Sequence, residues 1–224
     1  MDSRNQFQNE ARFSDIVWVS EIHGVSQNYQ VYRHLIPILR KIGYTSVALE
    51  YPSDLNGEFN ENKFSKYQNI QDGRFSQESL DFFRWLDLQE INRGCFDISS
   101  PADQQNREYL MAQNLMSLFH KEKTLVISGG FHSQKRLQRI NDHDILPQSG
   151  VVEQVTSKKI VRIGIKYLAG QFYNFSLKKL TSEMKSYDEL KLNFGDISRN
   201  IDASLDENWW IHSGPATPIH LLNQ

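Results

Sequence analysis

Apolar residues are arranged in two alternating ways along the first 130 residues, as short unbroken runs and as helical stripes. The runs cover residues 16–20, 46–49, 95–98 and 124–128. Runs of this length that are rich in β-branched residues are typical of strands buried on both faces. Between them, residues 26–42, 75–92 and 100–120 repeat apolar side chains at helical spacing. This alternation predicts a mainly parallel sheet covered by helices.

The pattern changes after Gly150. Apolar residues then gather in further runs, which cover residues 151–155, 160–169, 172–177 and 209–212. Gly170 and Gln171 suit a tight turn between two of these runs. Strands joined by such turns are antiparallel. The expected fold class is therefore α/β, with a mainly parallel central sheet, helices on both faces and antiparallel strands added in the C-terminal half.

The length of 224 residues fits one α/β domain, so residues 1–224 are taken as a single unit. Residues 1–14 are polar and are predicted to form a tail that lacks the apolar segment of a secretion signal. Residues 51–74 are rich in Asn, Ser, Gln and Gly. They are predicted to form a long loop or lid, a kind of segment that is often functional.

Charge and composition limit the classes of function that this protein can have. The chain has 25 Lys and Arg against 27 Asp and Glu, a formal net charge of −2, which gives no support for a nucleic-acid-binding surface. No apolar stretch approaches the roughly 18 residues of a membrane span. The single cysteine, Cys95, excludes an internal disulfide and a cysteine-based zinc cluster. We expect a cytoplasmic protein that acts on a small molecule or a peptide, with no nucleic-acid or membrane partner.

Charged side chains stand where the predicted strands end. Glu21, Glu50, Asp97 and His132 each lie at a C-terminal strand tip, and His23 follows two residues after Glu21. The C-terminal ends of parallel strands meet at one edge of a sheet, where ligands bind in open α/β folds. We therefore expect these five side chains to share one pocket. A strand-end Asp also often caps the next helix, which is the alternative role for Asp97.

The predicted helix over residues 100–120, opened by a Ser-Pro pair, adds one more charged group. One stripe of this helix consists of Arg107, Met111, Asn114 and Leu118. Apolar members of the stripe should face the core, so Arg107 should face inward as well. A buried Arg needs a carboxylate partner, and Glu21 and Glu50 are the expected ones.

Four segments, in this order, match a known signature. They are Ser-Glu-Ile-His at 20–23, Val-Ala-Leu-Glu-Tyr-Pro at 47–52, Arg-Glu-Tyr-Leu-Met-Ala-Gln-Asn at 107–114 and Gly-Gly-Phe-His at 129–132. With them the chain resembles the superfamily that unites erythromycin esterase-like hydrolases, Tiki and related peptidases, and haem-binding iron-regulated lipoproteins. Residues 209–218 resemble the closing strand of the esterase-like branch. Ser20 stands where the signature has a glycine.

The resemblance implies a hydrolase that acts on an ester, a lactone or an amide. Water would be the nucleophile, because no Ser or Cys lies in a nucleophile motif such as G-x-S-x-G. His23 or His132 would be the general base, for which an ordinary pKa near 6.5 is suitable. Glu21 or Glu50 would orient the histidine or the water, and Arg107 would stabilise the oxyanion.

Two further functions stay open at this stage. The Tiki-like relatives imply a divalent metal, for which Glu21, His23 and His132 are the candidate ligands. The haem-binding relatives imply a ligand-binding protein without chemistry, with Tyr51 or Tyr67 as ligands. In a hydrolase, the candidates for substrate binding are Asp97, Asn114 and Tyr51.

Overall fold

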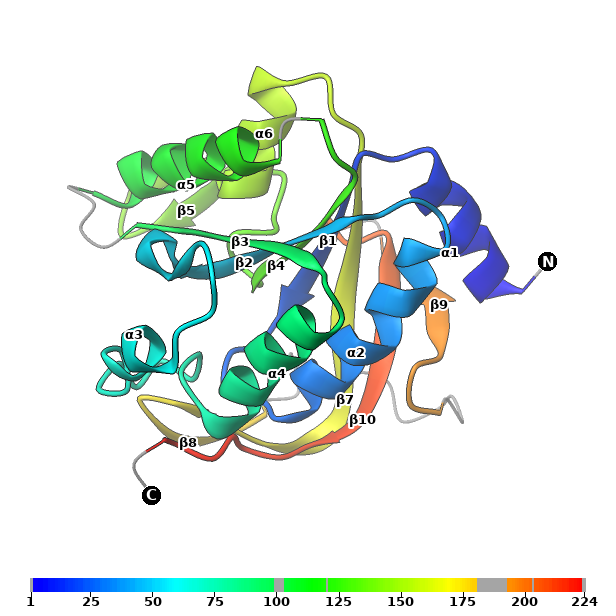
Figure 1. Ribbon diagram of the computed structural model, residues 1–224. Coiled ribbons are helices and arrows are strands. Elements are labelled where there is room, and N and C mark those ends of the chain that lie inside the picture. Colours follow the sequence, from blue (N-terminus) through cyan, green and yellow to red (C-terminus); the bar gives the residue numbers. More distant parts are fainter. Residues whose placement is uncertain (1, 99–102, 120, 181–192, 203, 223–224) are drawn as a thin grey trace.

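Six parallel strands form most of one eight-stranded sheet in this computed structural model, which describes residues 2–98, 103–119, 121–180, 193–202 and 204–222 (Figure 1). The strands are β1 (Ile16–Glu21), β2 (Ser46–Pro52), β3 (Asn92–Asp97), β4 (Thr124–Gly129), β7 (Ile160–Asn174), β8 (Ser176–Lys179), β9 (Ile197–Arg199) and β10 (Trp209–Ala216). Their order is β3-β2-β4-β1-β7-β10-β9, and β8 pairs with β7. Only β8 and β9 run antiparallel to their neighbours. A separate hairpin joins β5 (Gln138–Ile140) and β6 (His143–Ile145).

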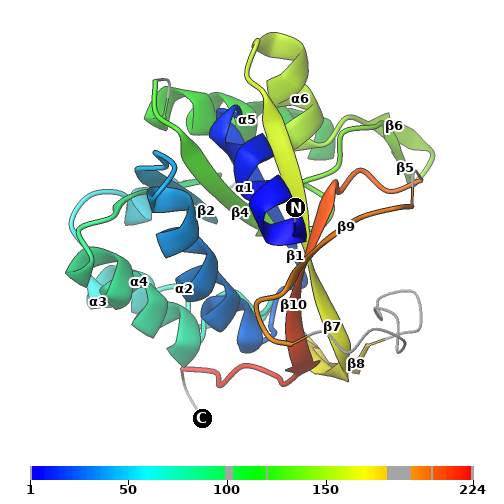
Figure 2. The same cartoon turned by 90° about the vertical axis from the view of Figure 1, so that its right-hand side faces the viewer.

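Helices cover both faces of the sheet (Figures 1 and 2). Helices α2 (Gln27–Arg40) and α4 (Gln77–Leu88) lie over one face, and α5 (Gln104–Leu118) and α6 (Gln148–Val155) lie over the other. Successive side chains of a strand point to opposite faces. Along β1, Val17 and Val19 therefore join the core on the α2 side, and Ile16 and Trp18 join the core on the α5 side. None of the helices among the described residues has the length and apolar character needed to cross a bilayer.

The expected α/β class, the mainly parallel sheet and the antiparallel strands in the C-terminal half are confirmed, but not every strand of that half is antiparallel. β7 and β10 are parallel to β1, and within this sheet the antiparallel strands are β8 and β9. The tight turn lies at Phe175, where φ is 55°, and not at Gly170 and Gln171. A Cβ at Gly170 would lie 2.0 Å from the carbonyl oxygen of Ala216 on β10. This glycine therefore permits close approach of two strands and does not make a turn.

Two segments are helical where the sequence predicted a strand and a tail. Residues 151–155, a predicted strand, form the end of α6, because so short an apolar run fits a buried helix turn as well as a strand. Residues 1–14, a predicted tail, contain α1 (Ser3–Arg12), with Asp2 as the N-cap. Phe7 and Ala11 lie four residues apart on one face of α1 and are both buried. This pair is the only helical signal in an otherwise polar stretch.

The helix that carries Arg107 begins later than predicted. Its N-cap is Asp103, whose side chain accepts a hydrogen bond from the Asn106 amide at 2.7 Å. The expected Ser-Pro opening at residues 100–101 lies outside the described residues. Met111 is fully buried, whereas Leu118 at the end of the helix is exposed. The predicted stripe therefore faces inward over the first turns of α5 and not at its end.

Residues 51–74 do not form an open loop. They contain η1 (Ser53–Leu55) and α3 (Glu61–Ser65), whose Phe64 is fully buried. The ring of Tyr67 stacks on Phe75 with 5.1 Å between the centroids. These aromatic contacts hold the segment against α4, and the segment ends at Arg74 beside the tip of β2.

Candidate functional site

Four adjacent strands bring their charged ends to one edge of the sheet. β3, β2, β4 and β1 are neighbours in that order. They carry Asp97, Glu50, the segment leading to His132, and Glu21. Neighbouring strands lie about 4.8 Å apart, so side chains at their ends are within reach of one another. The structure brings these groups together as the positions of the strand ends predicted.

The first Glu-His pair belongs to β1. The Nδ1 atom of His23 lies 2.5 Å from Oε1 of Glu21. Its Nε2 atom lies 3.6 Å from Oε2 of Glu50. A Cβ at Gly129 would lie 3.0 Å from His23 Nε2, so a glycine at this point of β4 leaves room for the imidazole. Both ring nitrogens of His23 therefore face carboxylate oxygens.

The second Glu-His pair joins the end of β4 to α5. The Nδ1 atom of His132 lies 2.7 Å from Oε2 of Glu108, and its Nε2 atom lies 3.3 Å from Oε1 of Glu50. Glu108 is fully buried. It accepts further hydrogen bonds from the Gln104 side chain at 2.5 Å and from the Gln148 amide at 2.9 Å. Glu50 therefore stands between two imidazoles and presents one oxygen to each.

Two arginines complete the cluster. Nη2 of Arg107 lies 2.7 Å from Oδ1 of Asp97 and 3.5 Å from Oε1 of Glu50. Its Nη1 lies 3.1 Å from Nε2 of His132. Nη1 of Arg74 lies 2.7 Å from the other oxygen of Asp97, and its Nη2 lies 2.7 Å from Asp72. Asp97 thus binds both guanidinium groups, and it does so in place of the helix-capping role.

The expected burial and pairing of Arg107 are found, with a different principal partner. Its side chain is only 17% exposed. The sequence predicted Glu21 or Glu50 as partners. Asp97 lies closest, Glu50 is more distant, and Glu21 makes its contacts to His23 and Asn28 instead. Helix α5 packs on β3, and β2 and β4 lie between β3 and β1, which accounts for the choice of Asp97.

The histidines do not have the ordinary pKa near 6.5 that the sequence suggested. Burial alone would lower the pKa of His23, but the carboxylates of Glu21 and Glu50 raise it to about 10. Burial also works against the charged form of His132, and Glu50 and Glu108 raise its pKa to about 9. The two imidazoles in turn hold the pKa of Glu50 well below its usual value, although burial opposes this. The raised pKa values favour the imidazolium form of both histidines at neutral pH.

Two charged groups of the site, Glu108 and Arg74, were not predicted from the sequence, and neither was the support of Glu21. Glu108 follows Arg107 directly, but it lies off the stripe that was used to find inward-facing residues. Arg74 lies in a polar segment without periodicity, so no pattern marks it. Glu21 is held by the Asn28 side chain, which also accepts a hydrogen bond from the Tyr167 hydroxyl at 2.6 Å.

Three predicted ligand residues lie outside the cluster. The Asn114 side chain donates to the carbonyl of Phe96 at 3.2 Å. The Tyr51 hydroxyl donates to the carbonyl of Arg74 at 2.7 Å, and its ring lies among core phenylalanines. The Tyr67 hydroxyl donates to Asp54 at 2.6 Å. Both tyrosine hydroxyls therefore bond to groups other than the two histidines.

The donor set does not fit a divalent metal. Within the described residues, no group of three or more His, Cys, Asp and Glu side chains is arranged to hold an ion. The Nδ1 atoms of His23 and His132 already face Glu21 and Glu108. The Arg107 guanidinium, a permanent cation, lies beside the Nε2 atom of His132.

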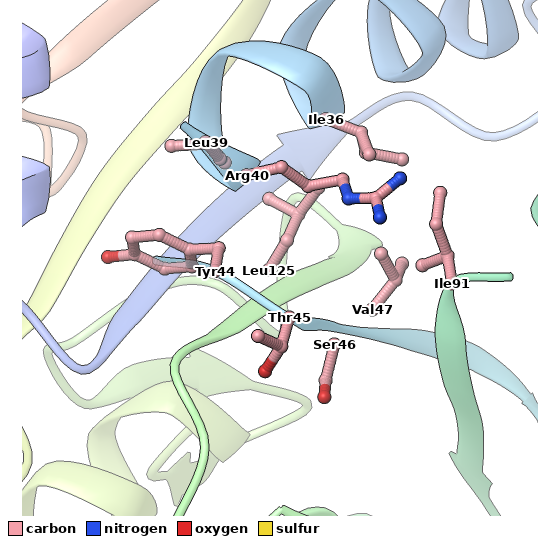
Figure 3. A pocket seen from close by; sticks show the side chains of 9 residues that line it. All are labelled: Ile36, Leu39, Arg40, Tyr44, Thr45, Ser46, Val47, Ile91 and Leu125. Atoms are coloured by element: carbon pink, nitrogen blue, oxygen red, sulfur yellow. The ribbon is translucent and has the colours of Figure 1, made fainter. Parts of the chain in front are cut away.

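Two cavities in the described part of the chain lie away from these side chains. One holds about 10 Å³ beneath the end of α2, beside apolar groups such as Ile36 and Leu125 (Figure 3). That volume accepts at most one water molecule. The other, of about 480 Å³, is lined by charged residues of α6, β7 and residues 199–208. At the site itself, His23 and Arg107 are the most exposed side chains, at 16% and 17%.

Comparisons with known proteins agree on the fold. No known protein family matches the sequence, and no curated protein matches it. A succinoglycan biosynthesis protein superposes with a TM-score of 0.66 and 12% identity, over 96% of this chain and 91% of that one. A Bacillus cereus protein superposes with a TM-score of 0.62 and 12% identity, over 99% of this chain and 94% of that one. The type III effector HopBA1 superposes with a TM-score of 0.50 and 13% identity, over 96% of this chain and 94% of that one. Identities this low establish a shared fold only.

The charges of the site predict how stability depends on pH. Because the pKa values of His23 and His132 are raised, protonation of these two rings stabilises the fold. This contribution is complete below pH 6.5, the pKa of histidine in the unfolded chain, and is lost as the pH rises toward 9 and 10. The ionised carboxylate of Glu50, whose pKa is lowered, stabilises the fold above pH 4.5, the pKa of glutamate in the unfolded chain. This contribution is lost as the pH falls. Urea midpoints should therefore be highest between pH 4.5 and 6.5 and should fall steadily up to pH 10. A midpoint that rises from pH 6.5 to 9 would contradict the assigned charges.

Proposed function

We propose that this chain is a hydrolase of the erythromycin esterase-like kind, which cleaves an ester, a lactone or an amide with water as the nucleophile and without a metal. One observation carries the proposal. The Nε2 atoms of His23 and His132 face the two oxygens of Glu50 at 3.6 and 3.3 Å, with the Arg107 guanidinium 3.1 Å from the second of them. Two imidazoles, one of which can exchange a proton, and an anion-stabilising guanidinium group therefore converge on one point.

Water fits the role of nucleophile better than a side chain does. Cys95, the one cysteine, is buried on β3, and burial raises the pKa of its thiol to about 12. The hydroxyls of Ser128 and Ser133 are bonded to Trp18 and to a backbone carbonyl. No serine hydroxyl among the described residues is hydrogen-bonded to His23 or His132.

The proposed reaction has two proton transfers. An imidazole in its neutral form takes a proton from water as the oxygen attacks the carbonyl carbon. The resulting oxyanion is stabilised by the Arg107 guanidinium and by the second imidazole, which stays charged. The first imidazole then returns its proton to the leaving oxygen or nitrogen as the carbonyl is re-formed. The motif resemblance at residues 20–23, 47–52, 107–114 and 129–132 supports this assignment, since these segments carry most of the cluster.

The proposal predicts turnover by the purified protein on a panel of p-nitrophenyl esters, a γ-lactone and a p-nitroanilide. His23→Ala should remove most of that activity, because it takes away one of the two imidazoles. His143, an exposed histidine on β6, is the matched control, and His143→Ala should leave the rate unchanged. Treatment with EDTA should also leave the rate unchanged. Initial rates at saturating substrate measure all three effects.

Two outcomes would separate this proposal from the alternatives. Loss of activity with EDTA and its recovery with a divalent ion would favour the metal-dependent peptidase. Absence of turnover on the whole panel, together with a haem absorbance band after addition of haem, would favour a ligand-binding protein. Full activity of His23→Ala on every accepted substrate would overturn the catalytic site as described.

A further inference from the structure

The two histidines differ in the groups that surround them. Around His23, the atoms facing the ring nitrogens are both carboxylate oxygens, Oε1 of Glu21 at 2.5 Å and Oε2 of Glu50 at 3.6 Å. Carboxylates only accept hydrogen bonds when ionised, so both nitrogens of this ring must carry a hydrogen to satisfy them. This arrangement serves one protonation state, the imidazolium ion.

Around His132, the Nε2 atom has a donor and an acceptor within reach. Nη1 of Arg107 lies 3.1 Å away, and Oε1 of Glu50 lies 3.3 Å away. A guanidinium group can only donate, so its contact needs the free lone pair of a neutral imidazole. A carboxylate can only accept, so its contact needs the N–H of an imidazolium. Both protonation states of His132 therefore have a partner already in place.

Glu108 fixes the other nitrogen of the same ring. It is fully buried, and its Oε2 atom accepts from His132 Nδ1 at 2.7 Å and from the Gln148 amide at 2.9 Å. The Gln104 side chain donates to its Oε1 atom at 2.5 Å. With the carboxylate held by donors from α5 and α6, the neutral form of His132 keeps its hydrogen on Nδ1. The Nε2 lone pair is then directed toward Arg107 and Glu50.

From this difference we infer a division of labour that rests on the proposed function. His132 is the catalytic residue that exchanges the proton, Glu108 is its positioning residue, and His23 remains an imidazolium ion that stabilises negative charge. In the first step neutral Nε2 of His132 takes the proton from water while the new C–O bond forms. In the second step the same Nε2–H gives that proton to the leaving atom as its bond to carbon breaks, and His132 returns to the neutral form.

The charged groups around His132 agree with this assignment. From β2 it faces Glu50, and from α5 it faces Arg107 and Glu108, with Asp97 of β3 behind Arg107. The carboxylates raise its pKa to about 9, below the value of about 10 for His23. The Arg107 guanidinium beside Nε2 of His132 also disfavours the charged form of this ring, so we expect His132 to become neutral first as the pH rises.

The deciding experiment is a titration of the protein labelled with ¹⁵N-histidine, with His23→Asn and His132→Asn used to assign the signals. We expect His132 to lose its proton at a lower pH than His23 and to lose it from Nε2, so that its neutral form carries hydrogen on Nδ1. A titration in which His23 becomes neutral first, or in which neutral His132 keeps the hydrogen on Nε2, would overturn the assignment. The titration needs no substrate, so it can refute this division even where turnover persists, whereas absent turnover refutes the proposed function.

Glu108→Gln tests the positioning role in the kinetics. Loss of the carboxylate should lower kcat on the order of 10²-fold. It should also move the rising limb of the pH–rate profile to lower pH, because one of the two carboxylates that raise the pKa of His132 is gone. Glu58→Gln, at an exposed position, is the matched control and should change neither quantity. A Glu108→Gln protein with an unmoved limb, whatever its stability, would show that Glu108 is a structural residue only.

Discussion

Removal of the His132 imidazole should lower kcat by about 10²- to 10⁴-fold, the range expected for a positioned general base. The effect should be at least as large as for His23, because His132 carries the proton in both steps. His132→Ala also leaves the buried Glu108 without one of its three donors. We therefore expect a loss of about 1–3 kcal/mol in stability, more than the value below 1 kcal/mol that an open strand tip would imply.

His132→Asn separates the two effects. The amide nitrogen of Asn can take the place of Nδ1 and donate to Glu108, while nothing replaces Nε2. Stability should therefore be largely restored, and activity should stay as low as in His132→Ala. Urea unfolding and kcat measured on the same preparations check this, with His143→Ala as the control. If His132→Asn were folded and fully active, the imidazole would not be the base.

Replacement of Arg107 by alanine is the second large expected effect. The side chain is mostly buried and contacts Asp97, Glu50 and His132. Breaking a buried ion pair costs about 3–5 kcal/mol. Since Arg74 remains beside Asp97, we expect the lower end, about 3 kcal/mol, which corresponds to a fall in Tm of roughly 6–12 °C for a protein of this size. Catalysis should fall as well, because the oxyanion loses its guanidinium.

Two further variants make the Arg107 result interpretable. Arg107→Lys keeps the positive charge but cannot contact Asp97 and His132 at the same time, so it should recover stability more than rate. Arg139→Ala removes an exposed arginine with only distant carboxylate partners and should change neither Tm nor kcat. Should Arg107→Ala match the parent protein in both Tm and kcat, the guanidinium would be irrelevant to the site.

The strand-end part of the site was predictable because parallel strands impose it. Once the runs before Glu21, Glu50, Asp97 and His132 are taken as parallel strands, their ends must meet at one edge, whatever the sequence between them. Arg107 was predictable for a similar reason, since it shares a helical face with the buried Met111.

The partners within the cluster were not predictable, because they depend on strand order and on packing between distant segments. Strand order decides that Arg107 contacts Asp97 and not Glu21. Arg74 reaches the site because aromatic side chains such as Phe64 hold residues 51–74 against Phe83 of α4, which no periodicity in that segment shows. The raised histidine pKa values follow from how closely the carboxylates approach each ring, which strand order and packing decide.

The errors in the C-terminal half have a common cause. Short apolar runs such as residues 151–155 fit both a buried helix and a strand, and only their contacts decide between them. Gly170 was taken as a turn residue, although it serves close approach between β7 and β10. In both cases the local pattern is compatible with two structures, and a segment far away in the sequence selects one.

The central claim is that His23 and His132 act in one site through Glu50. A double-mutant cycle on one accepted ester tests it most directly, with kcat/KM measured for the parent, His23→Ala, His132→Ala and the double variant. We predict that the double variant loses little more than the worse single variant, a coupling of about 0.5–3 kcal/mol. Losses that add in free energy, so that the two factors simply multiply, would show that the histidines act independently and would contradict the shared site.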